Sequence, residues 1–323
     1  MARGDPGVWT MATIGRMFGG GAETFMGVPA CDDPSAVKGR AALIGAPVAT
    51  SYPSVGAYCA GAPAAIRAAA SAYAANRGHV NFDLGAAALP DGALADCGDL
   101  GRDAADAAGN RLRIRNAVAA VLGAGAVPVV LGGDDSVPIP VLQGFAGQPA
   151  LTVLQVDAHI DWREQVEGER WGLSSTMRRA SEMGHVEAIV QVGARGIGSA
   201  RPEDLAAAHD WGARIVTAET LALEGLEAAL AQIPAGAQVF VALDLDALDP
   251  AAMPAVIAPT AGGLGYWQVL GLIKGAAARG RIAGMTMTEF MPDHDVQGRG
   301  AALAAQLLTS ACGLIGAAGD ARA

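Results

Sequence analysis

Three aspartate-rich motifs occur in order along this chain, and each follows an apolar segment. They are GGDDS at 132–136, DAHID at 157–161 and DLDALDP at 244–250, and the segments before them, at 127–131, 151–156 and 239–243, read as buried strands. In an open α/β sheet, ligand-binding residues gather outside the carboxyl ends of the strands. The motifs therefore predict a common site rich in carboxylate oxygens and one imidazole, which are ligands of divalent metal ions.

The spacing within two motifs directs their side chains to one side of the chain. A strand sends alternate side chains to the same face, so Asp157, His159 and Asp161 project together while the backbone is extended. Asp244 and Asp246 do the same. Two divalent ions about 3.5–4 Å apart can share a hydroxide and make it a nucleophile near neutral pH. Each motif alone also fits a solvated or Asx-capped turn, whereas three in order favour a metal site.

Composition limits the classes of protein that fit. The chain has 323 residues, of which 52% are hydrophobic, and its formal net charge is −10. This length can bury a sizeable core. The acidic balance argues against nucleic-acid binding, which needs a basic surface, and suits a cationic small molecule. The four cysteines lack CxxC spacing, which favours a reduced, cytoplasmic compartment over a disulfide framework.

No segment reads as a signal peptide or a membrane span. Charged residues interrupt the first thirty residues, and the longest uncharged run, 117–133, contains glycines and a proline. That run is also shorter than the roughly 20 apolar residues of a membrane helix. We expect a soluble protein without membrane association.

Strand and helix patterns alternate from residue 39 onward. Strands are expected at 41–48, 127–131, 151–156, 185–192, 213–216, 237–243 and 281–289. Helices are expected at 62–76, 103–122, 175–184, 202–210, 219–232, 266–278 and 300–313. This alternation predicts an α/β fold with a mostly parallel sheet and helices on both faces. Residues 1–38 lack clear periodicity and are expected to form an N-terminal arm before a single catalytic domain, 39–323.

The motifs resemble those of the ureohydrolases, the family of arginase and agmatinase, which run GGDHS, DAHxD and SxDxDxxDP. The likeness extends from Ala41 to Gly319 and includes Gly193-Ala194-Arg195 and Glu289. It implies a three-layer αβα sandwich with an arginase-like parallel sheet of about eight strands. It also implies trimeric or hexameric assembly and a binuclear Mn²⁺ or Ni²⁺ centre.

The resemblance assigns metal ligands within the three motifs. Asp157 and Asp244 would bridge the two ions. Asp161 would complete the shell of one ion, and His159 with Asp246 that of the other. The full set of expected ligands is Asp135, Asp157, His159, Asp161, Asp244 and Asp246.

The resemblance also implies how substrate is held. Glu289 would bind the guanidinium, whose paired N–H donors match the two oxygens of a carboxylate; a salt-bridged residue at a strand end is the alternative. Glu289 and Asp161 are the expected catalytic residues. Tyr52, Tyr58 and Trp171 could line a pocket for a small or N-alkylated guanidine, with Trp171 stacking on the cation or serving as a buried loop anchor. Tyr52, Trp171 and Glu289 form the expected substrate-binding set.

The chain departs from the family pattern in two places. Asp135 stands where the family has a histidine ligand, which favours hard, oxygen-loving ions such as Mn²⁺ without excluding Ni²⁺. The alternative is the loss of one ion. No histidine lies between Asp161 and His185, where several relatives carry one thought to shuttle protons. Proton delivery to the leaving amine must then use another group or water.

These observations predict a metal-dependent amidinohydrolase. A metal-bridging hydroxide would attack the guanidinium carbon and break a linear C–N bond, releasing urea or an ammonia equivalent with an amine. Agmatine, guanidinobutyrate, guanidine or a biguanide-like compound is expected rather than arginine, because no amino-acid carboxylate clamp is recognised. One alternative is a non-catalytic or weakly active subunit that partners a complete paralogue in a hetero-oligomer. Another is a formimino or acyl-amidine hydrolase on the same scaffold.

Overall fold

One parallel sheet runs through the computed structural model, which describes residues 22–198 and 200–318. Its strands are β1 (Ala41–Ala46), β4 (Leu94–Asp99), β5 (Val127–Gly132), β6 (Leu151–Val156), β7 (Val186–Val192), β8 (Arg214–Val216), β9 (Gln238–Asp244) and β10 (Arg281–Thr288). Their spatial order is β4-β1-β5-β10-β9-β6-β7-β8, and all neighbours pair in parallel. The predicted α/β class with about eight parallel strands is therefore confirmed.

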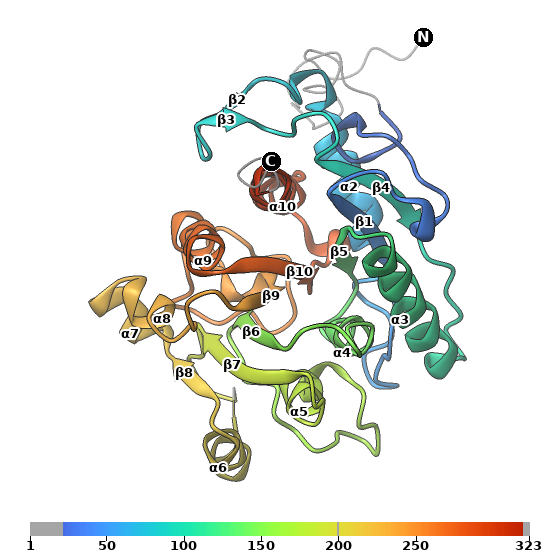
Figure 1. The fold of residues 1–323 in the computed structure, drawn as a ribbon. Coiled ribbons are helices and arrows are strands. Elements are labelled where there is room, and N and C mark those ends of the chain that lie inside the picture. Colours follow the sequence, from blue (N-terminus) through green and yellow to red (C-terminus); the bar gives the residue numbers. More distant parts are fainter. Residues whose placement is uncertain (1–21, 199, 319–323) are drawn as a thin grey trace, which may run out of the picture.

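Helices cover both faces of this sheet (Figure 1). They are α2 (Ala62–Ser71), α3 (Ala107–Gly123), α4 (Pro138–Gln143), α5 (Thr176–Ser181), α6 (Pro202–Trp211), α7 (Ala218–Glu224), α8 (Glu227–Leu230), α9 (Tyr266–Arg279) and α10 (Arg299–Ala317). Helices α2, α9 and α10 pack on one face, and α3, α4 and α5 pack on the other. A small antiparallel hairpin, β2 (Val80–Asn81) and β3 (Ala86–Ala87), projects from the body.

The sheet separates two hydrophobic cores. Alternate residues of β5 enter different cores: Val129 and Leu131 lie with α2, α9 and α10, whereas Val130 packs with Val118 of α3. Because both faces are buried, the central strands are almost continuously apolar, which is what made them recognisable in the sequence.

Among the elements that differ from the prediction, four have a plain physical reason. Strand β4 was missed because its second half is polar and contains Gly98. Helix α4 was missed because it begins with two prolines, which its first turn tolerates. The helix expected at 219–232 is two helices, since Gly225 between them has a φ of 83°. The helix expected at 62–76 ends at Ser71, and a separate 3₁₀ turn follows at 74–76.

The described part of the expected arm, residues 22–38, lies against the edge of the sheet. Phe25 is fully buried, and its N–H donates to Oδ2 of Asp96 over 2.9 Å. Ala30 forms an isolated parallel bridge with Asp96. Residues 1–21 lie outside the described residues, so the arm and its boundary at residue 38 stay a prediction.

Helix α10 combines a length and an apolar composition that would let it cross a membrane. Within this fold, however, 72% of that apolar window is buried. Leu307, Leu308 and Ala311 of the helix belong to the core that also contains α2 and α9. Its hydropathy is therefore explained by its place in the core of the sandwich.

Candidate metal centre and substrate pocket

Four neighbouring strands end together beneath one pocket. In the order β5-β10-β9-β6, Leu131 is aligned with Met287, Thr288 with Asp244, and Leu243 with Val156. The three aspartate motifs and Glu289 follow these strands directly. The parallel register thus brings segments that are far apart in the sequence to the same edge of the sheet.

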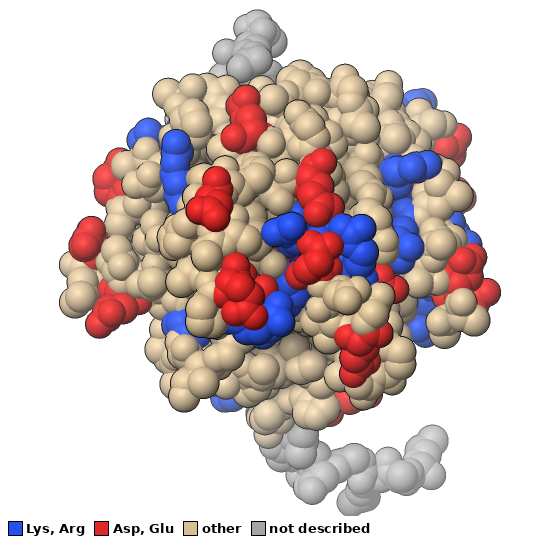
Figure 2. Space-filling view, turned by 90° about the horizontal axis from the view of Figure 1, so that it is seen from below, with Lys and Arg blue, Asp and Glu red and all other residues tan. Residues whose placement is uncertain are grey.

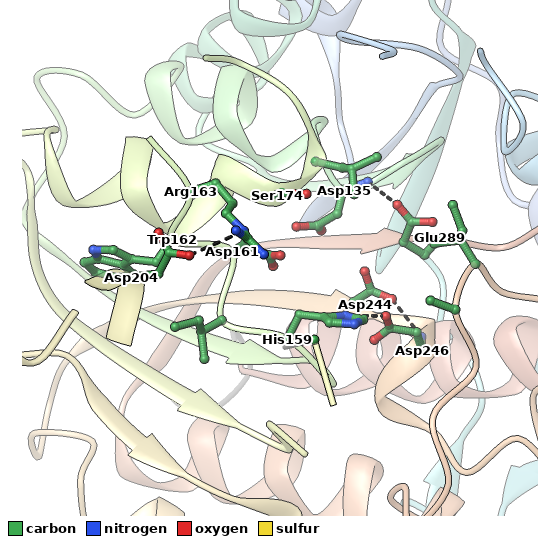
Figure 3. A pocket seen from close by; sticks show the side chains of 15 residues that line it. Asp135, His159, Asp161, Trp162, Arg163, Ser174, Asp204, Asp244, Asp246 and Glu289 are labelled. Atoms are coloured by element: carbon green, nitrogen blue, oxygen red, sulfur yellow. Dashed lines mark hydrogen bonds and ion pairs between the residues drawn. The ribbon is translucent and has the colours of Figure 1, made fainter. Parts of the chain in front are cut away.

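The side chains of these segments point into the pocket from several directions (Figure 3). Asp135 and Glu289 lie on one side of it, while His159, Asp244 and Asp246 lie on another. The predicted residues that line the pocket are Asp135, His159, Asp161, Asp244, Asp246 and Glu289. Asp157 lies among them and is only 2% exposed.

Two groups of side chains are placed to hold cations. Asp157, His159 and Asp246 offer ligand atoms within 4.8 Å of one another, and Asp135, Asp157 and Asp244 do the same. Asp157 belongs to both groups, as a residue that bridges two ions must. Asp244 belongs only to the second group, and Asp161 lies beside these groups without joining either.

Backbone N–H groups fix one oxygen of several carboxylates. The N–H of His159 donates to Oδ1 of Asp157 over 2.6 Å, and that of Ala158 to Oδ1 of Asp246 over 3.0 Å. The N–H of Asp246 donates to Oδ1 of Asp244 over 2.7 Å. Each side chain is oriented in this way while its second oxygen is left for another partner.

Two buried amides position the carboxylates from beneath. The Nε2 of Gln155 donates to Oδ2 of Asp157 and Oδ2 of Asp161, each over 2.7 Å. Gln191 is the register partner of Gln155 on β7. Its Nε2 donates to the side-chain oxygen Oε1 of Gln155 and to the backbone carbonyl of Ile160. Gln155 therefore ties Asp161 to Asp157. Sequence reasoning missed it, although a glutamine inside an otherwise apolar strand was a usable signal.

Burial and mutual repulsion raise the pKa values of three carboxyls in this cluster. Burial raises the pKa of the Asp135 and Asp161 carboxyls well above the ordinary value, and the charge of Asp157 raises it further. Burial raises the pKa of Asp244 in the same way, followed by the charge of Asp246. A buried group of like charges is costly unless cations neutralise it.

The donor set fits divalent metal ions. Burial tends to lower the pKa of His159, but Asp157 and Asp246 outweigh it and raise that pKa to about 12. Nδ1 of His159 lies 2.9 Å from Oδ2 of Asp246 and 3.5 Å from Oδ1 of Asp157. Among the described residues, Oδ2 of Asp135 is buried without a hydrogen-bond partner. Acids gathered around one imidazole, with an orphaned oxygen, provide what a hard or borderline cation binds.

Glu289 is anchored to the GGDDS turn at the edge of this cluster. It is only 1% exposed and has a positive φ of 68°, so its backbone is held in a strained conformation. Its N–H donates to the Gly133 carbonyl over 2.9 Å, and the N–H of Asp135 donates to its Oε1 over 2.8 Å. Burial raises the pKa of the Glu289 carboxyl, and the charge of Asp134 raises it further.

The comparison with protein families decides the relationship. Residues 39–313 match the Arginase family. The chain belongs to the arginase family. It is 32% identical to the mitochondrial agmatinase of Gallus gallus over 234 residues, which cover 71% of this chain and 68% of that protein. It is 30% identical to the guanidinobutyrase of Pseudomonas aeruginosa, with 71% of this chain and 73% of that protein covered.

Solved structures give the same relationship. A hypothetical agmatinase from Burkholderia thailandensis superposes with a TM-score of 0.79 at 25% identity, covering 93% of this chain and 92% of that one. Proclavaminate amidino hydrolase from Streptomyces clavuligerus superposes with a TM-score of 0.76 at 26% identity, covering 91% and 96%. The predicted arginase-like fold and family are confirmed.

Two aromatic residues of the expected substrate-binding set pack against other parts of this arginase-family chain and do not line the pocket. Tyr52 is buried against Gly172, and its hydroxyl accepts from the N–H of Ser174 over 3.3 Å. The ring of Trp171 lies 5.4 Å from the guanidinium carbon of Arg111, so it already stacks on a cation of the protein. Neither residue is among those that line the pocket. Tyr52 thus contacts the loop that contains Trp171 and Ser174.

Three further residues of the pocket were not predicted. Trp162, Arg163 and Asp204 line it, and Nε of Arg163 lies 3.4 Å from Oδ2 of Asp204. Only the position of Trp162 and Arg163 directly after DAHID could have suggested them. Asp204 is on α6, and no spacing in the sequence relates it to the motifs.

Ion pairs stabilise the segment that follows Arg163. Arg179 of α5 is 1% exposed at its side chain, and its Nη2 lies 3.1 Å from Glu164 and 3.0 Å from Glu182. Arg170 lies 2.9 Å from Glu164. Acidic and basic side chains lie side by side across the middle of the face in Figure 2. A network of this kind positions the loop better than one exposed ion pair does.

Proposed function

We propose that this chain is a metal-dependent amidinohydrolase that breaks a linear C–N bond of a guanidino compound. The observation that carries the proposal is the pair of ligand groups sharing Asp157, with Glu289 in the same pocket. The predicted class of reaction is confirmed at the level of the family, since relatives are an agmatinase, a guanidinobutyrase and a guanidinopropionase. The roles of individual residues are our inference.

The proposed centre holds two divalent ions, Mn²⁺ or Ni²⁺. Its ligands are Asp135, Asp157, His159, Asp161, Asp244 and Asp246. When bound, the ions supply the Lewis acidity that lets water act as a nucleophile near neutral pH. Gln155 keeps the Asp157 and Asp161 carboxylates aimed at the centre, and Asp135 offers its unpartnered oxygen. The oxygen-rich donor set favours Mn²⁺ over Ni²⁺.

The chain's own residues orient the substrate over this centre. Glu289 accepts N–H groups of the guanidinium, as its charge and its place in the pocket allow. Asp161 contributes a carboxylate that lines the pocket, and Gln155 holds this carboxylate beside Asp157. Trp162 and Arg163 line the pocket, and the substituent of a small guanidine lies against them. Agmatine, guanidinobutyrate, guanidine and a biguanide-like compound remain the proposed candidates.

The test is turnover of a guanidino panel by purified, metal-loaded protein, scored for urea and for ammonia. We expect activity with Mn²⁺ or Ni²⁺, and a loss of at least about 100-fold in Asp157→Ala, because both ions lose a ligand. The exposed Asp32 provides the control, since Asp32→Ala removes the same group outside the pocket. Unchanged activity in Asp157→Ala or Asp244→Ala would refute the proposed metal centre, and no turnover of any guanidino compound would refute the hydrolase.

A non-catalytic subunit in a hetero-oligomer is the second candidate. Asp135 in place of the family's histidine favours it, as does the occupation of Glu289 by a hydroxyl of the protein itself. Turnover by the purified homomeric protein excludes this candidate. Activity that requires co-expression with a GGDHS-bearing relative, together with zero or one ion per chain, supports it.

We further propose that the chain is cytoplasmic and forms a homotrimer or homohexamer, as the resemblance implies. Exposed apolar side chains support assembly, since Phe82 is 94% exposed, Leu223 80% and Trp267 66%. Light scattering after size-exclusion chromatography measures the oligomer directly. A monomer at micromolar concentration would contradict the proposed assembly.

A further inference from the structure

A tyrosine hydroxyl contacts both oxygens of the Glu289 carboxylate. The hydroxyl of Tyr58 donates to this carboxylate and lies 2.9 Å from Oε1 and 2.9 Å from Oε2. An oxygen equally distant from both carboxylate oxygens lies on the plane that bisects them. A guanidinium that makes two parallel N–H···O bonds to a carboxylate is centred on that same plane. Tyr58 and a guanidinium held in this way therefore compete for the same two carboxylate oxygens.

The loop before α2 holds Tyr58 in this position. The next residue, Cys59, is 1% exposed, and its Sγ lies 3.7 Å from Oε2 of Glu289. The Cys59 carbonyl accepts from the N–H of Ala62, the first residue of α2. Burial raises the pKa of the Tyr58 hydroxyl, and the charge of Glu289 raises it further, so the hydroxyl keeps its proton and remains a donor.

The acceptor capacity of Glu289 is mostly used by the protein. An ionised carboxylate offers about four acceptor sites. The N–H of Asp135 and the hydroxyl of Tyr58 donate to Oε1, while Tyr58 and the weaker thiol donor of Cys59 share Oε2. A guanidinium can therefore make its two-point contact only after Tyr58 gives way.

We propose that Tyr58 competes with the guanidinium group of the ligand for the two carboxylate oxygens of Glu289 and so limits the affinity for that group. The inference rests on the proposed function only in taking a guanidinium as the ligand. It gives the effect of removing the hydroxyl a definite sign: binding of guanidinium becomes tighter. A tyrosine that only supported the fold would have no such effect, because its loss would weaken binding or leave it unchanged.

The test measures binding of guanidinium ion, added as the chloride, to metal-loaded protein by isothermal titration calorimetry. Tyr58→Phe keeps the ring and removes only the donor. We expect the dissociation constant to fall by about tenfold, because the ligand no longer displaces a hydrogen bond to a charged group. For a substrate that is turned over, KM should fall by a similar factor with a smaller change in kcat.

Tyr266→Phe is the matched control. The Tyr266 hydroxyl also donates to a carboxylate, that of Asp83, and neither residue lines the pocket of Glu289. Its dissociation constant for guanidinium should equal that of the wild type. Unchanged or weaker binding in Tyr58→Phe overturns the proposal, as does the absence of guanidinium binding to both proteins. Binding and product release are scored separately, so a chain that binds guanidinium but hydrolyses nothing refutes the hydrolase and not the role of Tyr58.

Discussion

The residues of the proposed metal centre differ in how well the sequence alone predicts them. The aspartates were predictable, because carboxylates that follow several apolar strands are typical of a functional site. Gln155 was not predicted and Tyr58 was expected only as a possible pocket residue, since each acquires its role from a partner that only the fold supplies. Gln155 contacts Asp161 across a turn, and Tyr58 contacts Glu289, which lies 231 positions away in the sequence. The spacing of residues along a strand or helix does not predict contacts between such pairs.

We expect the side-chain amide of Gln155 to contribute as much to metal affinity as some of the ligands do. In Gln155→Leu the side chain keeps its approximate size but no longer donates to Asp157 and Asp161. Metal affinity should fall by about 10- to 100-fold, as is usual when the partner of a ligand is removed. Competition with a fluorescent chelator measures this change.

Gln306→Leu provides the control, because Gln306 is exposed on α10. Its metal affinity should match that of the wild type. Equal affinities in Gln155→Leu and Gln306→Leu would show that Asp157 and Asp161 do not depend on the buried amide for their orientation.

At the scale of elements, strands with two buried faces were predictable and partly exposed elements were not. The segment 151–156 was placed at the bounds that the structure has, because every residue in it is buried. Strand β4, at the edge of the sheet, is buried only in its first half and carries no continuous apolar signal. Position at the edge of a sheet is a property of the whole topology, which a local pattern does not contain.

The GGDDS turn passes very close to the loop that leads to α2. A Cβ on Gly133 would lie 2.1 Å from the Pro47 carbonyl oxygen, which belongs to the backbone and cannot rotate away. Gly133→Ala should therefore cost about 1–3 kcal/mol of unfolding free energy through overpacking. Because the Gly133 carbonyl accepts from Glu289, the shift should also weaken guanidinium binding. Urea denaturation and calorimetry measure the two effects.

Gly78→Ala is the matched substitution, since a Cβ there meets nothing within 4 Å. It should leave both the stability and the ligand affinity close to those of the wild type. A Gly133→Ala protein as stable as Gly78→Ala would contradict the close approach of the turn and the loop.

For the whole molecule, the acidic cluster makes stability depend on pH and on metal. Burial raises the pKa of the Asp134 carboxyl to about 6 from 3.8. Stability from a raised carboxyl pKa is present below the unfolded value and is lost as the pH rises through the folded one. Asp135, Asp161 and Asp244 act in the same direction, whereas the pKa of Asp157 is lowered and opposes them.

We therefore expect the melting temperature of metal-free protein to fall as the pH is raised from about 5 to about 8. Bound cations neutralise the ionised cluster, and they compete with protons for the same oxygens, so metal stabilises most at the higher pH. Thermal melts with chelator and with Mn²⁺ across this range test the effect. A gap between the two melting temperatures that stays constant or narrows with rising pH would contradict it.

The position of β10 has a consequence for how this protein is made. It pairs with β5 on one side and β9 on the other, although both precede it in the sequence. During translation, those two strands leave the ribosome with an open slot between them, and unpaired strand edges of this kind invite aggregation. Chains that stall or terminate before Arg281 should consequently aggregate or depend on chaperones, rather than accumulate as partly working enzyme.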